Sequence, residues 1–189
     1  MLERLPYLLL LFCYEKQVLD HGGCFNAYTA SDRTAYMFSV NHDAFVETLD
    51  QFAHMFIDPL FSASGVEREL HAVDQEHDKN LEHDGYREFM VFKETGNPDH
   101  PNARFNSGNS STLGGIPREE VEKWYKDNYS ADKAHLVLYS SLPLEELISL
   151  TKEHFSSVPT SDHLTPLPYQ TLISSSQKGH LITIKPIND

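Results

Sequence analysis

Residues 43–57 carry apolar side chains at every third or fourth position, and this spacing predicts an amphipathic helix. The chain then reaches Pro59, and the residue before a proline is pushed away from helical geometry. We therefore expect the helix to end near Asp58. Its apolar positions are Phe45, Leu49, Phe52, Ala53 and Phe56.

A second and longer helical pattern covers residues 64–94. It opens on Ser64 and Glu67, which have the spacing of a capping box, and it stops at Gly96-Asn97-Pro98. The expected apolar stripe consists of Val66, Leu70, Val73, His77 and Leu81. Residues 96–115 read as a long loop, and further helices are expected after Pro117 and Pro143.

Three segments have the composition of β-strands. Residues 26–40 end in the alternating positions Tyr36, Phe38 and Val40, after a turn expected at residues 31–32. The segments AHLVLYS (134–140) and HLITIKP (180–186) are the other two. Strands and helices alternate along the chain, which predicts the α/β (α+β) class, with a mixed sheet packed against helices.

Length and charge narrow the class of protein. The chain has 189 residues, which suits one domain or one large domain with an appendage, and 40% of them are hydrophobic, which is enough to bury a core. Its net charge of −13 argues against unaided binding to nucleic acid or to anionic membranes. The apolar run at residues 5–14 is shorter than the about 20 residues that a membrane-spanning helix needs. A buried or mis-started segment, a signal-like segment and an interfacial segment all remain open for it.

The segment ERELHAVDQEHDKNLEH, residues 67–83, is rich in carboxylates and histidines. On a helix, Glu69, Glu76 and His83 share one face because they are seven residues apart. That face borders the apolar stripe, where a carboxylate is costly without a partner or a metal. The alternative is an ordinary solvated helix face.

A complete zinc motif is absent from the sequence. None of the eleven histidines has another histidine four positions away, so neither H-E-x-x-H nor H-x-x-E-H is present. The nearest pattern is VDQEH at residues 73–77, where valine occupies the first ligand position. The two cysteines, Cys13 and Cys24, do not have the spacing of a thiolate zinc site either.

Several sequence blocks, in order, resemble the first domain of the insulin-degrading enzyme and pitrilysin family of H-x-x-E-H metallopeptidases. The blocks are NAYTASDRTAYMFSV, LDQFAHMFIDPLF, RELHAVDQEHDKN, ETGNPDHPNARFNSGNSSTL and QKGHLITIKPI. This resemblance runs from about Asp20 to the C-terminus. It divides the chain into a non-matching apolar segment (1–19) and an incomplete pitrilysin-type peptidase domain (20–189), with the mixed sheet and helices of that domain.

The resemblance also implies functional residues. In the family, zinc is held by the two histidines of H-x-x-E-H and by a glutamate from a later helix, which maps to Glu76. Glu69 maps to a carboxylate that supports the ligands. Asn26 and Ala27 map to the strand edge that hydrogen-bonds an extended peptide substrate, and Tyr28 to the border of a side-chain pocket.

Because H-x-x-E-H is missing, we expect a fragment of a zinc metalloendopeptidase that is inactive as it stands. The alternative is a non-catalytic peptide-binding or partner subunit of the same fold. The expected partners are a peptide, bound by strand addition, and the missing domains of a larger peptidase. The sequence leaves the compartment open between cytoplasm and periplasm.

Overall fold

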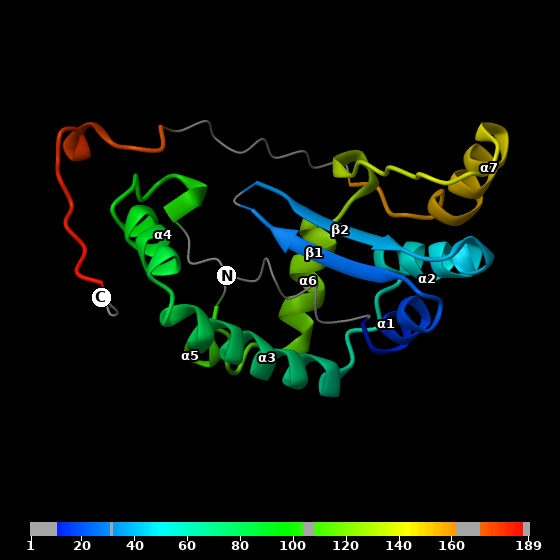
Figure 1. Ribbon diagram of the computed structural model, residues 1–189, viewed down its shortest axis with the longest axis horizontal. Helices are drawn as coiled ribbons and strands as arrows, with labels where there is room; N and C mark the ends of the chain where they lie inside the picture. Colours follow the sequence, from blue (N-terminus) through cyan, green and yellow to red (C-terminus); the bar gives the residue numbers. More distant parts are fainter. Residues whose placement is uncertain (1–10, 31, 104–107, 162–170, 187–189) are drawn as a thin grey trace.

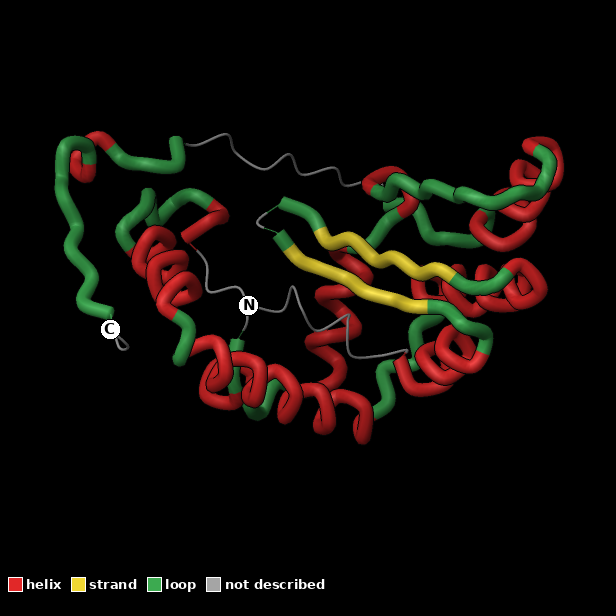
Figure 2. Tube along the Cα trace, viewed as in Figure 1, coloured by secondary structure: helices red, strands yellow, loops and turns green. Residues whose placement is uncertain are grey.

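A computed structural model describes residues 11–30, 32–103, 108–161 and 171–186. The strands of this part of the chain form one β-hairpin, and a long helix lies below it in the view of Figure 1. Figure 2 shows the same view coloured by secondary structure. The elements are α1 (Leu11–Asp20), β1 (Cys24–Thr29), β2 (Thr34–Ser39), α2 (Phe45–Ile57), α3 (Ala63–Leu81), α4 (Asp84–Glu94), α5 (Ser110–Leu113), α6 (Arg118–Asn128) and α7 (Leu144–Phe155).

The hairpin pairs β1 with β2 in antiparallel register, with Phe25 opposite Phe38 and Ala27 opposite Tyr36. Side chains alternate between its two faces, so Phe25, Ala27, Tyr36 and Phe38 share the half-buried face. A glycine turn brings the chain from α1 into β1. A side chain on Gly23 would lie 2.1 Å from the carbonyl oxygen of Ser39, so only glycine fits there.

The main core lies between the half-buried face of the hairpin and the helices α1 and α2. The ring of Phe52 lies 5.0 Å from that of Phe38 and 5.3 Å from that of Phe56, measured between centroids. The buried members of this cluster are Tyr14, Val18, Phe52 and Met55, and Phe25, Tyr36, Phe38, Phe56 and Phe155 pack against them. The helical spacing predicted for residues 43–57 therefore marks a true core face.

A smaller hydrophobic cluster packs α6 against the segment that follows α2. Phe61, Val121 and Tyr125 are buried together, and Tyr129 stacks on Tyr125 with ring centroids 4.3 Å apart. The hydroxyl groups of Tyr36 and Tyr129 are hydrogen-bonded at 2.6 Å. This bond joins the hairpin to the C-terminal end of α6, 93 residues further along the chain.

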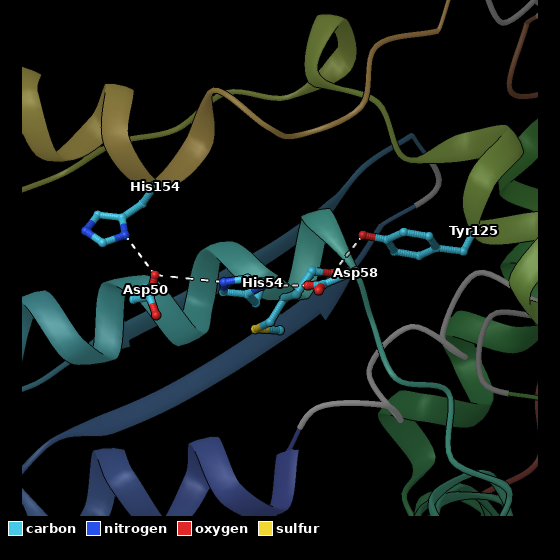
Figure 3. A network of polar contacts seen from close by, with 6 residues as sticks. Asp50, His54, Asp58, Tyr125 and His154 are labelled. Atoms are coloured by element: carbon cyan, nitrogen blue, oxygen red, sulfur yellow. Dashed lines mark hydrogen bonds and ion pairs between the residues drawn. The ribbon is translucent and has the colours of Figure 1, made fainter.

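Polar contacts along α2 connect it to two other helices (Figure 3). On α2 itself, Nδ1 of His54 lies 2.6 Å from Oδ1 of Asp58. Asp50 accepts a hydrogen bond from His154 of α7 at 2.9 Å. The hydroxyl of Tyr125, from α6, donates to the carbonyl oxygen of Met55 at 2.7 Å.

The helix predictions were confirmed over residues 43–57 and needed correction further on. The single helix expected over residues 64–94 is two helices, α3 and α4, because His83 adopts an extended conformation between them. The expected capping box at Ser64 is also wrong. The hydroxyl of Ser62 caps α3 by accepting from the backbone N–H of Gly65. Leu81, predicted in the apolar stripe, is exposed.

The strands expected at residues 134–140 and 180–186 are not formed among the residues that the structure describes. Both segments lack regular secondary structure. Among the described residues, the strands that pair are β1 and β2. Val137 is 86% exposed and Tyr139 97% exposed, although their types suit a strand. A strand needs a hydrogen-bonded neighbour, and sequence pattern alone does not supply one. The α+β class is confirmed, but with a two-stranded antiparallel sheet.

The helix α1 crosses the boundary that the resemblance placed at residue 20. Tyr14 and Val18 are buried in the main core, so this helix packs with the hairpin. Most of the apolar run at residues 5–14 lies outside the described residues. No helix in the described part of the chain is both long and apolar enough to cross a bilayer.

Replacing Phe52 by alanine should destabilise the fold by about 3–5 kcal/mol, because it leaves a cavity among four packed rings. Phe92→Ala is the matched control, since Phe92 is 43% exposed whereas Phe52 is 7% exposed. We expect the control to cost less than about 1 kcal/mol. Urea unfolding of both variants tests this, and equal losses would contradict the core assignment.

The contact between His54 and Asp58 should make stability depend on pH. The hydrogen bond to Asp58 raises the pKa of His54. Its stabilising effect is therefore present below the unfolded-state pKa of about 6.5 and is lost as the pH rises through the folded-state pKa. Unfolding measurements should show a larger loss from Asp58→Asn at about pH 5.5 than at about pH 8.5. The effect should be small because the pair is exposed, and the same pH dependence in a His54→Gln background would contradict it.

Candidate functional site

The helix α3 carries both carboxylates that the family resemblance assigned to a zinc site. Glu69 and Glu76 lie seven residues apart on this helix, which places them on the same face, two turns apart. The side chain of Glu76 is exposed, and the side chain of Glu69 lies outside the described part of the structure. His77, predicted on the core-facing stripe, is half-buried with its ring 6.5 Å from that of Tyr86 in α4. It therefore contributes to packing between α3 and α4.

Asp74, two positions before Glu76 on α3, holds the start of α5 against this helix. Its carboxylate accepts the backbone N–H of Ser110 at 2.6 Å. This hydrogen bond lowers the pKa of Asp74. Asn109 and Thr112 complete a capping box at the start of α5. The sequence did not single out this contact, because its two residues are 36 positions apart.

The strand β1 carries the three residues assigned to peptide binding. Asn26 and Tyr28 point to the exposed face of the hairpin, with Tyr28 47% exposed, while Ala27 points to the half-buried face. The Oδ1 atom of Asn26 accepts the backbone N–H of Ala27 at 2.8 Å. The three residues therefore occupy one strand, as the resemblance implied.

The backbone N–H and C=O groups of these three residues do not all point the same way. The N–H of Ala30 donates to the carbonyl of Arg33, so this pair is of the hydrogen-bonded type. Such pairs alternate along an antiparallel ladder. The backbone groups of Asn26 and Tyr28 consequently face β2, and those of Ala27 face away from it.

The donor groups described do not make a complete zinc site. Among the described residues, no group of three or more His, Cys, Asp or Glu side chains is arranged to hold a metal ion. A catalytic zinc site needs three protein ligands and an open position. Glu76 could supply one carboxylate ligand, but the chain has no H-x-x-E-H pair to join it. The zinc that the family implies therefore does not fit this set of residues alone.

Comparison with known protein families gives two matches. Residues 13–99 match the family model described as Insulinase (Peptidase family M16). Residues 115–188 match the model described as Peptidase M16 inactive domain. Together the two models cover the hairpin, α3 with both carboxylates, and the C-terminal half of the chain.

Individual relatives agree with these matches. The chain is 41% identical over 160 residues to the Arabidopsis thaliana protein named Insulin-degrading enzyme-like 1, peroxisomal, covering 81% of this chain and 16% of the relative. It is 36% identical over 162 residues to human insulin-degrading enzyme, covering 82% of this chain and 16% of the relative. The crystal structure of pitrilysin superimposes with a TM-score of 0.85 at 31% identity, covering 93% of this chain and 20% of pitrilysin.

The chain thus spans about a sixth to a fifth of the length of these relatives. The likeness extends through both halves of the chain, in sequence and in structure. The protein therefore belongs to the insulin-degrading enzyme and pitrilysin family of zinc metallopeptidases, as its sequence blocks predicted.

Proposed function

We propose that this chain is the part of a zinc metalloendopeptidase that contributes one zinc ligand, Glu76, and a peptide-binding strand, β1. On its own it binds an extended peptide and does not hydrolyse it. The observation that carries the proposal is the incomplete donor set: the family is one of zinc peptidases, and this chain lacks the motif that provides two ligands and the catalytic base.

The carboxylate part of the proposal rests on position. Glu76 lies in the block RELHAVDQEHDKN, and it is held on a long helix whose neighbouring turn is fixed by the contact between Asp74 and Ser110. A metal-binding side chain on a rigid helix keeps its orientation when the metal binds. Glu69, two turns earlier, is the proposed supporting carboxylate. The missing ligands would come from the rest of a longer peptidase, since the relatives are about five times as long as this chain.

The peptide part rests on the hairpin. An extended peptide can bind a sheet by adding a strand to its edge, with backbone hydrogen bonds supplying affinity and side-chain pockets supplying specificity. The backbone groups of Ala27 face away from β2, toward the position such a strand would take. Asn26 and Tyr28 flank Ala27 on the exposed face and would contact the side chains of the bound peptide.

The same strand favours the second candidate function, a non-catalytic peptide-binding or partner subunit. Both functions use β1, but only the first gives Glu76 a role. They differ in whether the chain regains hydrolysis when the missing ligands are supplied by the remainder of a family peptidase.

A quenched fluorescent peptide incubated with the chain and added zinc should show no hydrolysis above the rate of buffer with zinc. The reason is the absence of two ligands and the catalytic base. The decisive control is Glu76→Ala, which should match the unchanged chain. Zinc-dependent cleavage that Glu76→Ala abolishes would contradict the proposal.

Ala27→Pro should weaken peptide binding at least about tenfold, because proline removes the N–H that donates to Oδ1 of Asn26 in the free chain and would donate to a docked strand in its place. The hairpin itself should survive, since this N–H faces away from β2 and proline is tolerated at such edge positions. Fluorescence anisotropy with a labelled peptide measures the affinity, and circular dichroism with thermal unfolding confirms the fold. Unchanged affinity in a folded Ala27→Pro variant would contradict docking on β1.

A further inference from the structure

A groove lies between the start of α4 and the C-terminal segment of the described chain. It is open to solvent and has a volume of about 300 Å³, at the lower end of the range of about 300–1,000 Å³ that is usual for ligand sites. This is enough for a long side chain together with part of the backbone that carries it. The described residues that line the groove are Asp84, Gly85, Glu88, Ile182, Ile184 and Pro186.

Hydrogen bonds hold the C-terminal segment beside the end of α4. Asn97 donates its side-chain amide to the carbonyl oxygen of Thr171 and its backbone N–H to that of Leu172, both at 2.8 Å. The side-chain amide of Gln177 donates to the carbonyl oxygen of Gly96 at 2.6 Å. From there the chain continues as an extended segment to the end of its described part (Figure 1). One wall of the groove is therefore anchored to the loop that follows α4.

The C-terminal wall has the features of a strand without a neighbour. Ile182 and Ile184 line the groove at alternate positions, as the side chains of an extended chain do, and they are 50% and 36% exposed. In the described part of the chain, no backbone–backbone hydrogen bond joins residues 180–186 to another segment. Unpaired backbone groups of an extended segment are a template on which a second extended chain can pair.

The α4 wall contributes a carboxylate without a cation. Asp84 is paired with Arg87 at 3.1 Å, whereas Glu88, one turn after Asp84, is exposed and has no ion-pair partner among the described residues. The space beside Glu88 is open, because a Cβ atom on Gly85 would meet nothing within 4 Å. The groove thus combines an apolar wall, open space and one uncompensated negative charge.

We propose that this groove binds an extended peptide segment of a partner protein through a lysine or arginine side chain of that segment. The aliphatic stem would pack on Ile182 and Ile184, and the charged end would pair with Glu88. Long basic side chains cover apolar surface with their stems while the charged end stays in water, which suits an open groove. An acidic segment would be repelled by Glu88 and by the net charge of −13. This site goes beyond the proposed peptide binding at β1 and does not rest on it.

The test uses two labelled peptides of about eight residues, alike except for arginine or citrulline at the central position. Citrulline keeps the shape of arginine and lacks its charge. In fluorescence anisotropy with the full chain, we expect the arginine peptide to bind about 3- to 10-fold tighter. In Glu88→Gln the two peptides should bind alike. Glu82→Gln is the matched control, because it removes an exposed carboxylate outside the groove and should keep the preference.

Filling the groove gives a second test that does not depend on charge. Gly85→Leu should weaken both peptides at least about tenfold, because its side chain occupies the open space. Gly85→Ala is the control and should change the affinity less than about twofold. Both variants replace a glycine within α4, and alanine and leucine are better helix formers. Circular dichroism confirms that the variants are folded.

The outcomes distinguish this groove from β1 and from the acidic surface as a whole. The proposal is overturned if neither peptide binds, if both bind equally well, if the preference survives in Glu88→Gln, or if Gly85→Leu binds like Gly85→Ala. A preference that Glu82→Gln also removes would show diffuse attraction to an acidic surface and would overturn it too. Ala27→Pro should leave binding in the groove unchanged. Binding that is lost only in Ala27→Pro would place the peptide on β1, which overturns the groove and leaves the proposed function in place.

Discussion

The packing of Phe52 is the contact on which the rest of this structure depends. Its ring meets Phe38 from the hairpin, Tyr14 from α1 and Phe155 from α7, with centroids 5.0, 6.2 and 6.5 Å away. The hairpin and α1, which precede α2 in the chain, and α7, which follows it about 90 residues later, are thereby held on α2. Aromatic rings of this size bury large apolar areas and favour the edge-to-face and tilted geometries seen here. The hairpin has only two strands and would be marginal alone, so its stability comes from this cluster.

The same packing sets the position of the proposed peptide-binding strand. Because Phe25 and Phe38 face α1 and α2, the opposite face of the hairpin must carry Asn26 and Tyr28. Tyr36 extends the connection to α6 through its bond to Tyr129. The helix α3, which carries Glu76, is organised differently. It is anchored through contacts with α4 and α5, among which the bond between Asp74 and Ser110 is the most specific.

Much of this arrangement could be predicted from the sequence because its cause is local or recurrent. The spacing from Phe45 to Phe56 predicted one buried helix face, and the alternation of Tyr36, Phe38 and Val40 predicted a strand. The family itself followed from several blocks in order. The break at His83 was missed because residues 64–94 contain no proline, and the helix end was placed at Gly96-Asn97-Pro98. The segment around Val137 has strand composition, but a strand exists only with a neighbour. The contact of Asp74 with Ser110 and the hydrogen bond between Tyr36 and Tyr129 depend on tertiary packing, which no local pattern reports.

The central claim is that this chain holds one ligand of a zinc site and not the site itself. Zinc content after equilibration with zinc and removal of loosely bound metal tests it most directly, with Glu76→Gln as the matched variant. We predict well below one zinc per chain in both proteins, because a single carboxylate cannot hold zinc tightly. One tightly bound zinc per chain that disappears in Glu76→Gln would contradict the account.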